Sequence, residues 1–377
     1  MSRRHPAGTG DPLLDGRLNE LLDEMGVRYN RDLIFDILVA GVGLALDEAD
    51  RLDLKITSAA VREMRNAFRM FAPYRTAKKV TIFGSARATV TDPLYVQARD
   101  LAGELAQRGW MVVTGAGPGI MAAGLEGAGR EHSFGVRIRL PSEEHTASSL
   151  LADDRHVAMK YFFTRKLMLM KESHAFIALP GGVGTLDEVF ELLTLQQTGK
   201  ARPTPTVLLD VPHGTFWRSW EKFFVDEVLA RGFVSPDDRS IFTITDDPRC
   251  AVEHVTGFYR NYHSLRWVGD RLVLRLLAAP TDHDLAHLTH QFASLAVDGR
   301  LYRTGPLRSE REEHDHVDLP RLALRFDIFR MGSLHRLIAA VNQLPSAPES
   351  SAVAGLHSGA SQPGAAAVET SPEGTSP

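Results

Sequence analysis

The sequence is poor in cysteine and has no excess of positive charge. Cys250 is the one cysteine among 377 residues, which excludes an internal disulfide and a cysteine-rich metal site. Such usage fits a reducing compartment, so we expect a cytoplasmic protein. Lys and Arg total 43 against 47 Asp and Glu, and the formal net charge is −4. Because nucleic-acid binding favours a basic patch, we expect no nucleic-acid partner.

The sequence also lacks a long hydrophobic run. Its most apolar stretch, Ile34–Leu46, contains Asp36 and two glycines and is shorter than the roughly 18–20 residues of a membrane-spanning helix. We predict a buried helix there and no membrane partner. Met1–Pro6 has two arginines but no apolar stretch behind it, which argues against a signal peptide.

The most informative stretch is Pro180–Glu188, with the sequence PGGVGTLDE. Ala175–Leu179 before it is typical of a buried strand, and Val189–Leu195 after it has apolar residues at helical spacing. The motif is therefore predicted to be a strand, a glycine-rich turn and the first turn of a helix. Glycines carry no Cβ, so a ligand could approach this backbone closely.

This turn is predicted to bind an anion. The N–H groups of Gly184, Thr185 and Leu186 and the helix dipole would face it, and the Thr185 hydroxyl would add a donor. Glu188 lies three residues after Thr185 and hence on the same helix face. A carboxylate beside an anion site suits a substrate with a phosphate at one end and a bond to be broken at the other. An ordinary helix cap is the alternative, but a nine-residue run that includes an acid favours a functional site.

From Lys79 onward, short apolar runs alternate with helical patterns, which predicts an α/β fold with a doubly wound parallel sheet. Glycine-rich turns at Gly84, Gly115 and Gly181 each follow a predicted strand. In such sheets ligands bind outside the carboxyl ends of the strands, so these turns should meet on one edge. The predicted strands are Val80–Phe83, Trp110–Thr114, Phe134–Leu140, Ala175–Leu179 and Thr206–Leu209.

The turn Gly115–Gly119 does not fit the dinucleotide fingerprint. GxGxxG needs glycine where the chain has Ile120, and no acid follows at the expected distance of about 20 residues. A mononucleotide is therefore favoured over a nicotinamide cofactor. No lysine lies in a motif typical of pyridoxal phosphate enzymes, so we expect no cofactor.

Composition divides the chain into four parts. Residues 1–77 are predicted to be a loose arm, to residue 16, followed by helices that pack on the main domain, with Thr57 or Ser58 capping the third helix. Residues 78–258 form the nucleotide-binding domain, in which 142–155 is a polar loop over the site. Residues 259–344 have a βαββα order that suggests a small α+β domain of ferredoxin-like type. Residues 345–377 are predicted to be a disordered tail.

Two histidine groups lie in the C-terminal part. His283, His287 and His290 share a predicted helix face, and residues 312–316 form a polar turn. Neither group has the ligand set of a zinc site, so we favour a solvated surface and predict no metal.

The motifs together resemble the LOG (Lonely Guy) family. The resemblance covers about residues 78–230 and depends on Pro180–Glu188, Arg165 and Lys166 ahead of it, Gly84 with Ser85, and the turn Gly115–Gly119. Members are phosphoribohydrolases of cytokinin-type riboside 5′-monophosphates and related bacterial nucleosidases, and many were first labelled lysine decarboxylases. The resemblance implies a Rossmann-like homodimer without a redox cofactor. It also implies hydrolysis of a nucleoside 5′-monophosphate to a free base and ribose 5-phosphate.

The resemblance also implies roles for individual residues. Arg165 and Glu188 would be the catalytic pair, in which Glu188 stabilises positive charge at C1′ and orients or deprotonates water. Arg165 could hold the phosphate or the ribose, or support the leaving base. The remaining residues implied to bind the nucleotide and its phosphate are Gly84, Ser85, Gly115, Gly117, Gly119, Lys166, Gly181, Gly182, Gly184 and Thr185.

Two other functions compete with the hydrolase. A nucleotide sensor would use the same loop without hydrolysis and pass a signal through the C-terminal part. A DNA-processing protein of similar fold is disfavoured by the acidic charge balance. Glu188 separates the first two, since hydrolysis needs the acid and phosphate binding needs only the loop.

Overall fold

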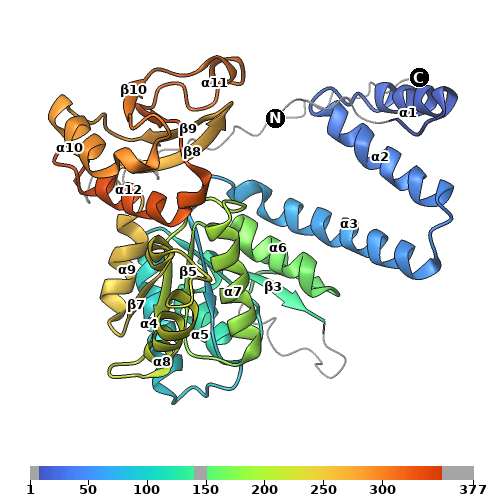
Figure 1. Cartoon of the computed structure of the whole chain (residues 1–377). Helices are drawn as coiled ribbons and strands as arrows, with labels where there is room; N and C mark the ends of the chain where they lie inside the picture. Colours follow the sequence, from blue (N-terminus) through green and yellow to red (C-terminus); the bar gives the residue numbers. More distant parts are fainter. Residues whose placement is uncertain (1–7, 140–150, 350–377) are drawn as a thin grey trace, which may run out of the picture.

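The computed structural model describes residues 8–139 and 151–349 (Figure 1). Of the polar loop predicted over the site, residues 142–150 lie outside the described residues. The same holds for 1–7 of the predicted arm and 350–377 of the predicted tail.

Seven parallel strands form the central sheet in the order β4-β3-β2-β1-β5-β6-β7. This order confirms the predicted doubly wound α/β fold, and its direction switches between β1 and β5. Strands β4 and β7, which are short and lie at the two edges of the sheet, are absent from the strands predicted above. The strands are β1 (Lys79–Phe83), β2 (Met111–Thr114), β3 (Ser133–Ile138), β4 (His156–Met159), β5 (Ala175–Ala178), β6 (Thr206–Leu209) and β7 (Thr243–Thr245).

Each face of the sheet has its own core because successive strand residues point in opposite directions. Val80 and Ile82 of β1 belong to one core, and Phe83 belongs to the other. Helices α4 (Pro93–Gln107), α5 (Ile120–Ala128) and α9 (Pro248–Gly257) cover the first face. The second face is covered by α3 (Arg51–Phe71), α6 (Phe162–Glu172), α7 (Val183–Gln197) and α8 (Phe216–Phe223).

The N-terminal helices differ from the prediction in where the first one begins, in which residue caps the third, and in the burial of the second. Helix α1 (Pro12–Glu24) already begins inside the predicted loose arm, with Asp11 as its cap. Helix α3 is capped by Asp50, whose carboxylate accepts from the N–H groups of Leu52 and Asp53. The cap is therefore not Thr57 or Ser58.

The predicted burial of Ile34–Leu46 is also wrong. Helix α2 (Arg31–Leu46) buries Phe35 alone among its described residues. Helices α1 and α2 stand away from the body, and α3 makes the contact with the sheet domain (Figure 1). Hydrophobicity predicted the helix correctly, but it did not reveal whether the rest of this chain supplies a partner for it.

The C-terminal residues form a separate α+β module with an antiparallel sheet in the order β10-β11-β9-β8. The element order is ββαββα when the short α11 is set aside, because β8 precedes and pairs with the first predicted strand. The predicted βαββα order is present from β9 to α12, and β8 adds one strand before it. The ferredoxin-like type of this domain stays a prediction. The elements are β8 (Tyr262–Val268), β9 (Arg271–Leu276), α10 (Asp282–Phe292), β10 (Tyr302–Thr304), α11 (Arg308–Glu312), β11 (Arg321–Leu324) and α12 (Met331–Gln343).

Ordered chain continues past the predicted start of the tail at residue 345. Ala347 is buried in the core that the C-terminal module shares with one face of the central sheet, and the Pro348 carbonyl accepts a hydrogen bond from Arg260. Within the described residues, no helix is long and apolar enough to cross a membrane.

Candidate functional site

The turns after β1, β2 and β5 meet at the carboxyl edge of the sheet, as predicted. The Ser85 N–H donates to the Pro180 carbonyl, and the Ile120 N–H donates to the Ser85 carbonyl. These bonds join three segments that are far apart in the sequence. They place the glycine-rich turns where the strand order switches, which is the usual ligand position in such sheets.

Several glycines are needed for this meeting of backbones. A Cβ on Gly181 would lie 2.9 Å from the Ser85 nitrogen and would overlap the Thr185 hydroxyl. Gly119 has a φ of +69° and packs against the backbone of Ser85. Gly84 packs as closely on Ile120, so these glycines hold the turns together.

Other glycines face open space. A Cβ on Gly182 or on Gly184 would meet no described atom within 4 Å. Room for a ligand therefore lies over the first turn of α7.

The predicted donors of the anion site need a correction. The N–H groups of Thr185 and Leu186 donate to the Gly182 carbonyl and are not free. Within the described part of the chain, neither Val183 nor Gly184 donates its N–H to another residue. The N–H groups without an acceptor at the start of α7 are therefore those of Val183 and Gly184, not those of Thr185 and Leu186.

Arg165 and Glu188 come together on facing helices. An Arg165 terminal nitrogen lies 3.6 Å from Glu188 Oε1, and Arg165 Nε donates to the Val136 carbonyl of β3 at 3.0 Å. A Cβ on Gly115 would overlap the guanidinium, so the turn after β2 leaves the space that Arg165 occupies. The side chain of residue 165 is thus fixed by β3, α7 and a glycine.

The environment of Glu188 is unusual for a carboxylate. The residue is 5% exposed, and Oε2 has no hydrogen-bond partner among the described residues. Burial raises the pKa of the Glu188 carboxyl to about 7, although Arg165 and Lys166 act in the opposite direction. A carboxyl with this pKa can exchange a proton near neutral pH, which is what general acid–base catalysis requires.

Lys166 does not face the open space over α7 as a spare cation. Its amino group forms ion pairs with Asp187 at 2.7 Å and with Glu191 at 2.8 Å. These bonds hold α6 against α7 and orient the helix that carries Arg165. Lys166 therefore has a structural role that competes with its predicted contact to the phosphate.

The other predicted residues occupy the same edge in different ways. The Ser85 hydroxyl accepts from the Arg87 N–H and stabilises its own turn. Thr185 is buried next to Gly181, and Gly117 lies against Met121.

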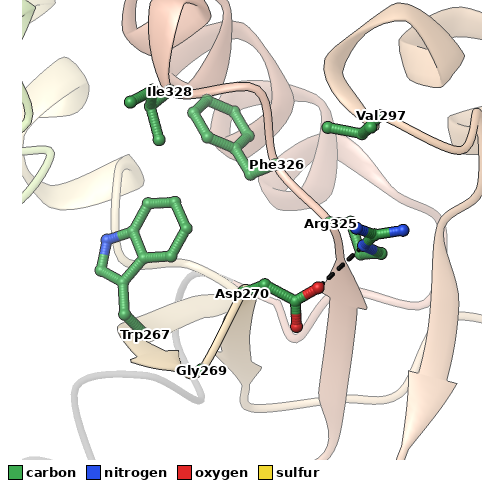
Figure 2. Close-up of a pocket in the computed structure, with 7 residues that line it drawn as sticks. All are labelled: Trp267, Gly269, Asp270, Val297, Arg325, Phe326 and Ile328. Carbon is green, nitrogen blue, oxygen red and sulfur yellow. Dashed lines mark hydrogen bonds and ion pairs between the residues drawn. The ribbon is translucent and has the colours of Figure 1, made fainter. Parts of the chain in front are cut away.

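A second hollow lies in the C-terminal module and contains none of the predicted site residues (Figure 2). Its volume is about 380 Å³. The Trp267 and Phe326 rings form part of its wall, and Arg325 and Asp270 pair at 2.9 Å on another side. The charges that could hold a ligand there already satisfy each other.

Sequence reasoning missed two groups at the main site. One is the Val136 carbonyl that receives Arg165. The other is Glu63 of α3, which is buried and bonds to the start of α6. An acid among the apolar positions of a helix was the available signal for Glu63. In the same described residues, no cluster of three metal-ligating side chains occurs.

The fold and the site define a doubly wound α/β protein with an arginine–glutamate pair beside a glycine-lined helix start. The family model described as "Possible lysine decarboxylase" matches residues 111–255. Cytokinin riboside 5′-monophosphate phosphoribohydrolase LOG3 of Arabidopsis thaliana is 34% identical over 148 residues, which span 38% of this chain and 66% of that relative.

A bacterial relative is matched over most of its length. The cytokinin riboside 5′-monophosphate phosphoribohydrolase of Mycobacterium tuberculosis is 30% identical over 191 residues, spanning 46% of this chain and 95% of the relative. The chain belongs to the LOG family. Among solved structures, the molybdenum cofactor carrier protein of Chlamydomonas reinhardtii covers 48% of this chain and 96% of its own, with 22% identity and a TM-score of 0.34.

Proposed function

We propose that this protein hydrolyses the N-glycosidic bond of nucleoside 5′-monophosphates to a free base and ribose 5-phosphate. The observation that carries the proposal is Glu188, a buried carboxyl beside Arg165 with one oxygen free of partners. The names of the Arabidopsis and mycobacterial relatives support the same reaction class. A helix cap alone would not require a buried acid behind the glycine-rich turn.

The reaction divides the work among three groups. The 5′-phosphate binds the N–H groups at the start of α7, where the helix dipole favours an anion. As the bond between C1′ and the base nitrogen breaks, positive charge develops on the ribose and the Glu188 carboxylate stabilises it. Water supplies the oxygen that bonds to C1′ and gives one proton to Glu188. The departing nitrogen takes up one proton from solvent, and Glu188 later returns its proton to solvent.

Arg165 acts beside the carboxylate. Its guanidinium is fixed by Val136 and Glu188, so it is a rigid donor for the phosphate, the ribose or the leaving base. It also lowers the pKa of Glu188 and increases the fraction of carboxylate at neutral pH.

We also propose that the protein is a homodimer. Exposed apolar side chains gather on α6 and α7 next to the catalytic pair, where a second copy could cover them. The exposed members are Phe162, Phe163, Leu167, Val183 and Phe190.

The test is incubation with AMP, GMP, CMP and UMP, followed by detection of the free base. We expect the wild type to release base from at least one of them and Glu188→Gln to lose the activity by a hundredfold or more. Glu253→Gln, at an exposed acid on the opposite face of the sheet, serves as the matched control. Binding of monophosphates without any turnover would instead support the nucleotide sensor.

A further inference from the structure

Glu63 of α3 is bonded to the start of α6. Its Oε1 accepts from the Lys160 N–H at 2.7 Å, and its Oε2 accepts from the Thr164 hydroxyl at 2.7 Å. Glu63 and Thr164 are both buried. Burying a carboxylate is costly unless its oxygens are satisfied, and here each oxygen has a partner on the same short segment.

Helix α6 has no side-chain cap of its own. Its N-cap residue, Tyr161, makes no side-chain capping bond. The first N–H groups of a helix need an acceptor and favour a negative charge. Glu63, about 100 residues earlier in the sequence, bonds on both sides of this helix start, to the Lys160 N–H before the helix and to the Thr164 hydroxyl in its first turn. Its negative charge therefore lies beside the N-terminus of α6.

Thr164, which donates its hydroxyl to Glu63, lies one residue before the proposed catalytic arginine. Thr164 fixes the rotation of the first turn of α6, and Arg165 follows it directly. From that turn, Arg165 must reach the Val136 carbonyl at 3.0 Å and Glu188 at 3.6 Å. A small rotation of α6 would break both contacts. Catalytic groups lose their function when they are displaced by as much as about 1 Å, so such a rotation would matter.

We infer that Glu63 is a positioning residue that sets the place of Arg165 beside Glu188. This inference rests on the proposed function for its effect on catalysis. Glu63 lies outside the residues that match the family model, 111–255, on the helix that connects α1 and α2 to the sheet domain. The N-terminal extension is therefore part of the active-site support.

The test compares Glu63→Ala with Glu63→Gln, which keeps an oxygen for Lys160 and a polar group for Thr164. We expect Glu63→Ala to lower kcat/KM about tenfold or more, and Glu63→Gln to stay within about threefold of the wild type. Arg65→Ala, at an exposed residue of the same helix, should leave kcat/KM unchanged.

The pH profile distinguishes positioning from simple stabilisation. Arg165 lowers the pKa of Glu188, so a displaced Arg165 moves the acidic limb of the kcat/KM profile to higher pH. If Glu63→Ala lowers only the melting temperature, with the wild-type kcat/KM and acidic limb, the inference is overturned. Should Glu63→Ala fail to fold, Thr164→Val removes one of the two bonds, and an unchanged limb in that variant overturns the inference equally.

A readout without turnover separates this inference from the proposed function. The Glu188 carboxyl can be titrated by ¹³C NMR of glutamate-labelled protein, with Glu188→Gln to assign its signal. A higher pKa of Glu188 in the Glu63 or Thr164 variant supports positioning even if the wild type hydrolyses none of the monophosphates. An unchanged pKa overturns the inference whether or not hydrolysis is found.

Discussion

Arg165 and Glu188 lie 3.6 Å apart between α6 and α7, but the second carboxylate oxygen of Glu188 has no partner among the described residues. A structural ion pair would be expected to satisfy both oxygens, because an unpaired buried acceptor costs about 1–3 kcal/mol. A buried carboxyl with one unpaired oxygen is expected where a substrate or a water molecule supplies the missing hydrogen bond.

The buried carboxyl of Glu188 predicts a loss of stability as the pH rises. The folded pKa of about 7 lies above the ordinary value of 4.5 for a glutamate, so the folded state holds the proton more tightly between these values. The contribution of Glu188 to stability therefore falls as pH increases through this window, by up to about 3 kcal/mol. Glu188→Gln has no such proton to lose and should be the more stable protein at pH 8.

Urea unfolding at pH 5 and pH 8 measures this difference. The wild type should lose more stability than Glu188→Gln between the two values, and Glu253→Gln should behave as the wild type. Equal losses in all three proteins would mean that Glu188 ionises at an ordinary pKa and is not the buried acid described above.

Gly181 and Gly182 should respond differently to alanine. In Gly181→Ala the new methyl group overlaps Thr185 and lies 2.9 Å from the Ser85 nitrogen, so we expect a loss of about 1–3 kcal/mol. In Gly182→Ala the methyl meets no described atom within 4 Å, and the helix cap changes by less than about 1 kcal/mol. Gly182→Ala should nevertheless weaken AMP binding at least tenfold, because the methyl occupies the ligand's space.

Thermal unfolding and calorimetric titration with AMP separate the two effects. The diagnostic result is a near wild-type melting temperature together with lost binding in Gly182→Ala. If that variant binds AMP as the wild type does, the phosphate does not lie over the first turn of α7.

Local patterns predicted the parts of the site that local sequence controls. The strand–glycine–helix units around Gly84, Gly115 and Gly181 follow from residue periodicity and from backbone freedom, so their meeting at one edge could be anticipated. Resemblance to a family paired Arg165 with Glu188. Strands β4, β7 and β8 were missed. All three lie at sheet edges, and β4 and β7 are also short.

Long-range relationships could not be predicted in the same way. The bond of Glu63 to Thr164 joins residues 101 apart, and no single segment encodes it. Lys166 was assigned to phosphate from its sequence position, but the fold places Asp187 and Glu191 within reach of it. Helix α2 was expected to be buried because apolar content predicts a helix, whereas its partner depends on the rest of the fold.

The buried ion pairs of Glu310 predict that the stability of the C-terminal module depends on a charge network. Its carboxylate lies 2.7 Å from Arg275 and 3.1 Å from Arg321, and all three side chains are almost inaccessible to solvent. Glu310→Ala would leave two guanidinium groups without their shared acid and should cost about 3–5 kcal/mol. Glu312→Ala breaks the exposed pair with Arg308 and should cost less than about 1 kcal/mol.

Urea unfolding of the two full-length variants at pH 7 checks this contrast. A similar small loss in both would show that solvent reaches Glu310. A large loss in Glu310→Ala alone would show that the network holds β9, β11 and α11 together.

The burial of His335 in α12 predicts a contribution to stability that is lost at acid pH. The ring is buried 6.1 Å from that of Phe258. Burial lowers the pKa of His335 to about 3, and nearby His254 acts in the same direction. The unfolded chain takes up the proton near the ordinary value of 6.5, so it binds more protons than the folded state below that pH. The contribution of His335 to stability should therefore fall by roughly 2 kcal/mol as the pH drops from 6.5 to 5, opposite in sign to the contribution of Glu188 over the same range.

His335→Phe keeps a ring beside Phe258 and removes the titrating group. Its stability should fall less steeply between pH 6.5 and 5 than that of the wild type, whereas His287→Gln, at an exposed histidine of α10, should follow the wild type. Parallel curves for all three proteins would mean that His335 is protonated in the folded state. In that case the packing of α12 against the sheet domain would have to tolerate a buried positive charge, which the surrounding apolar side chains oppose.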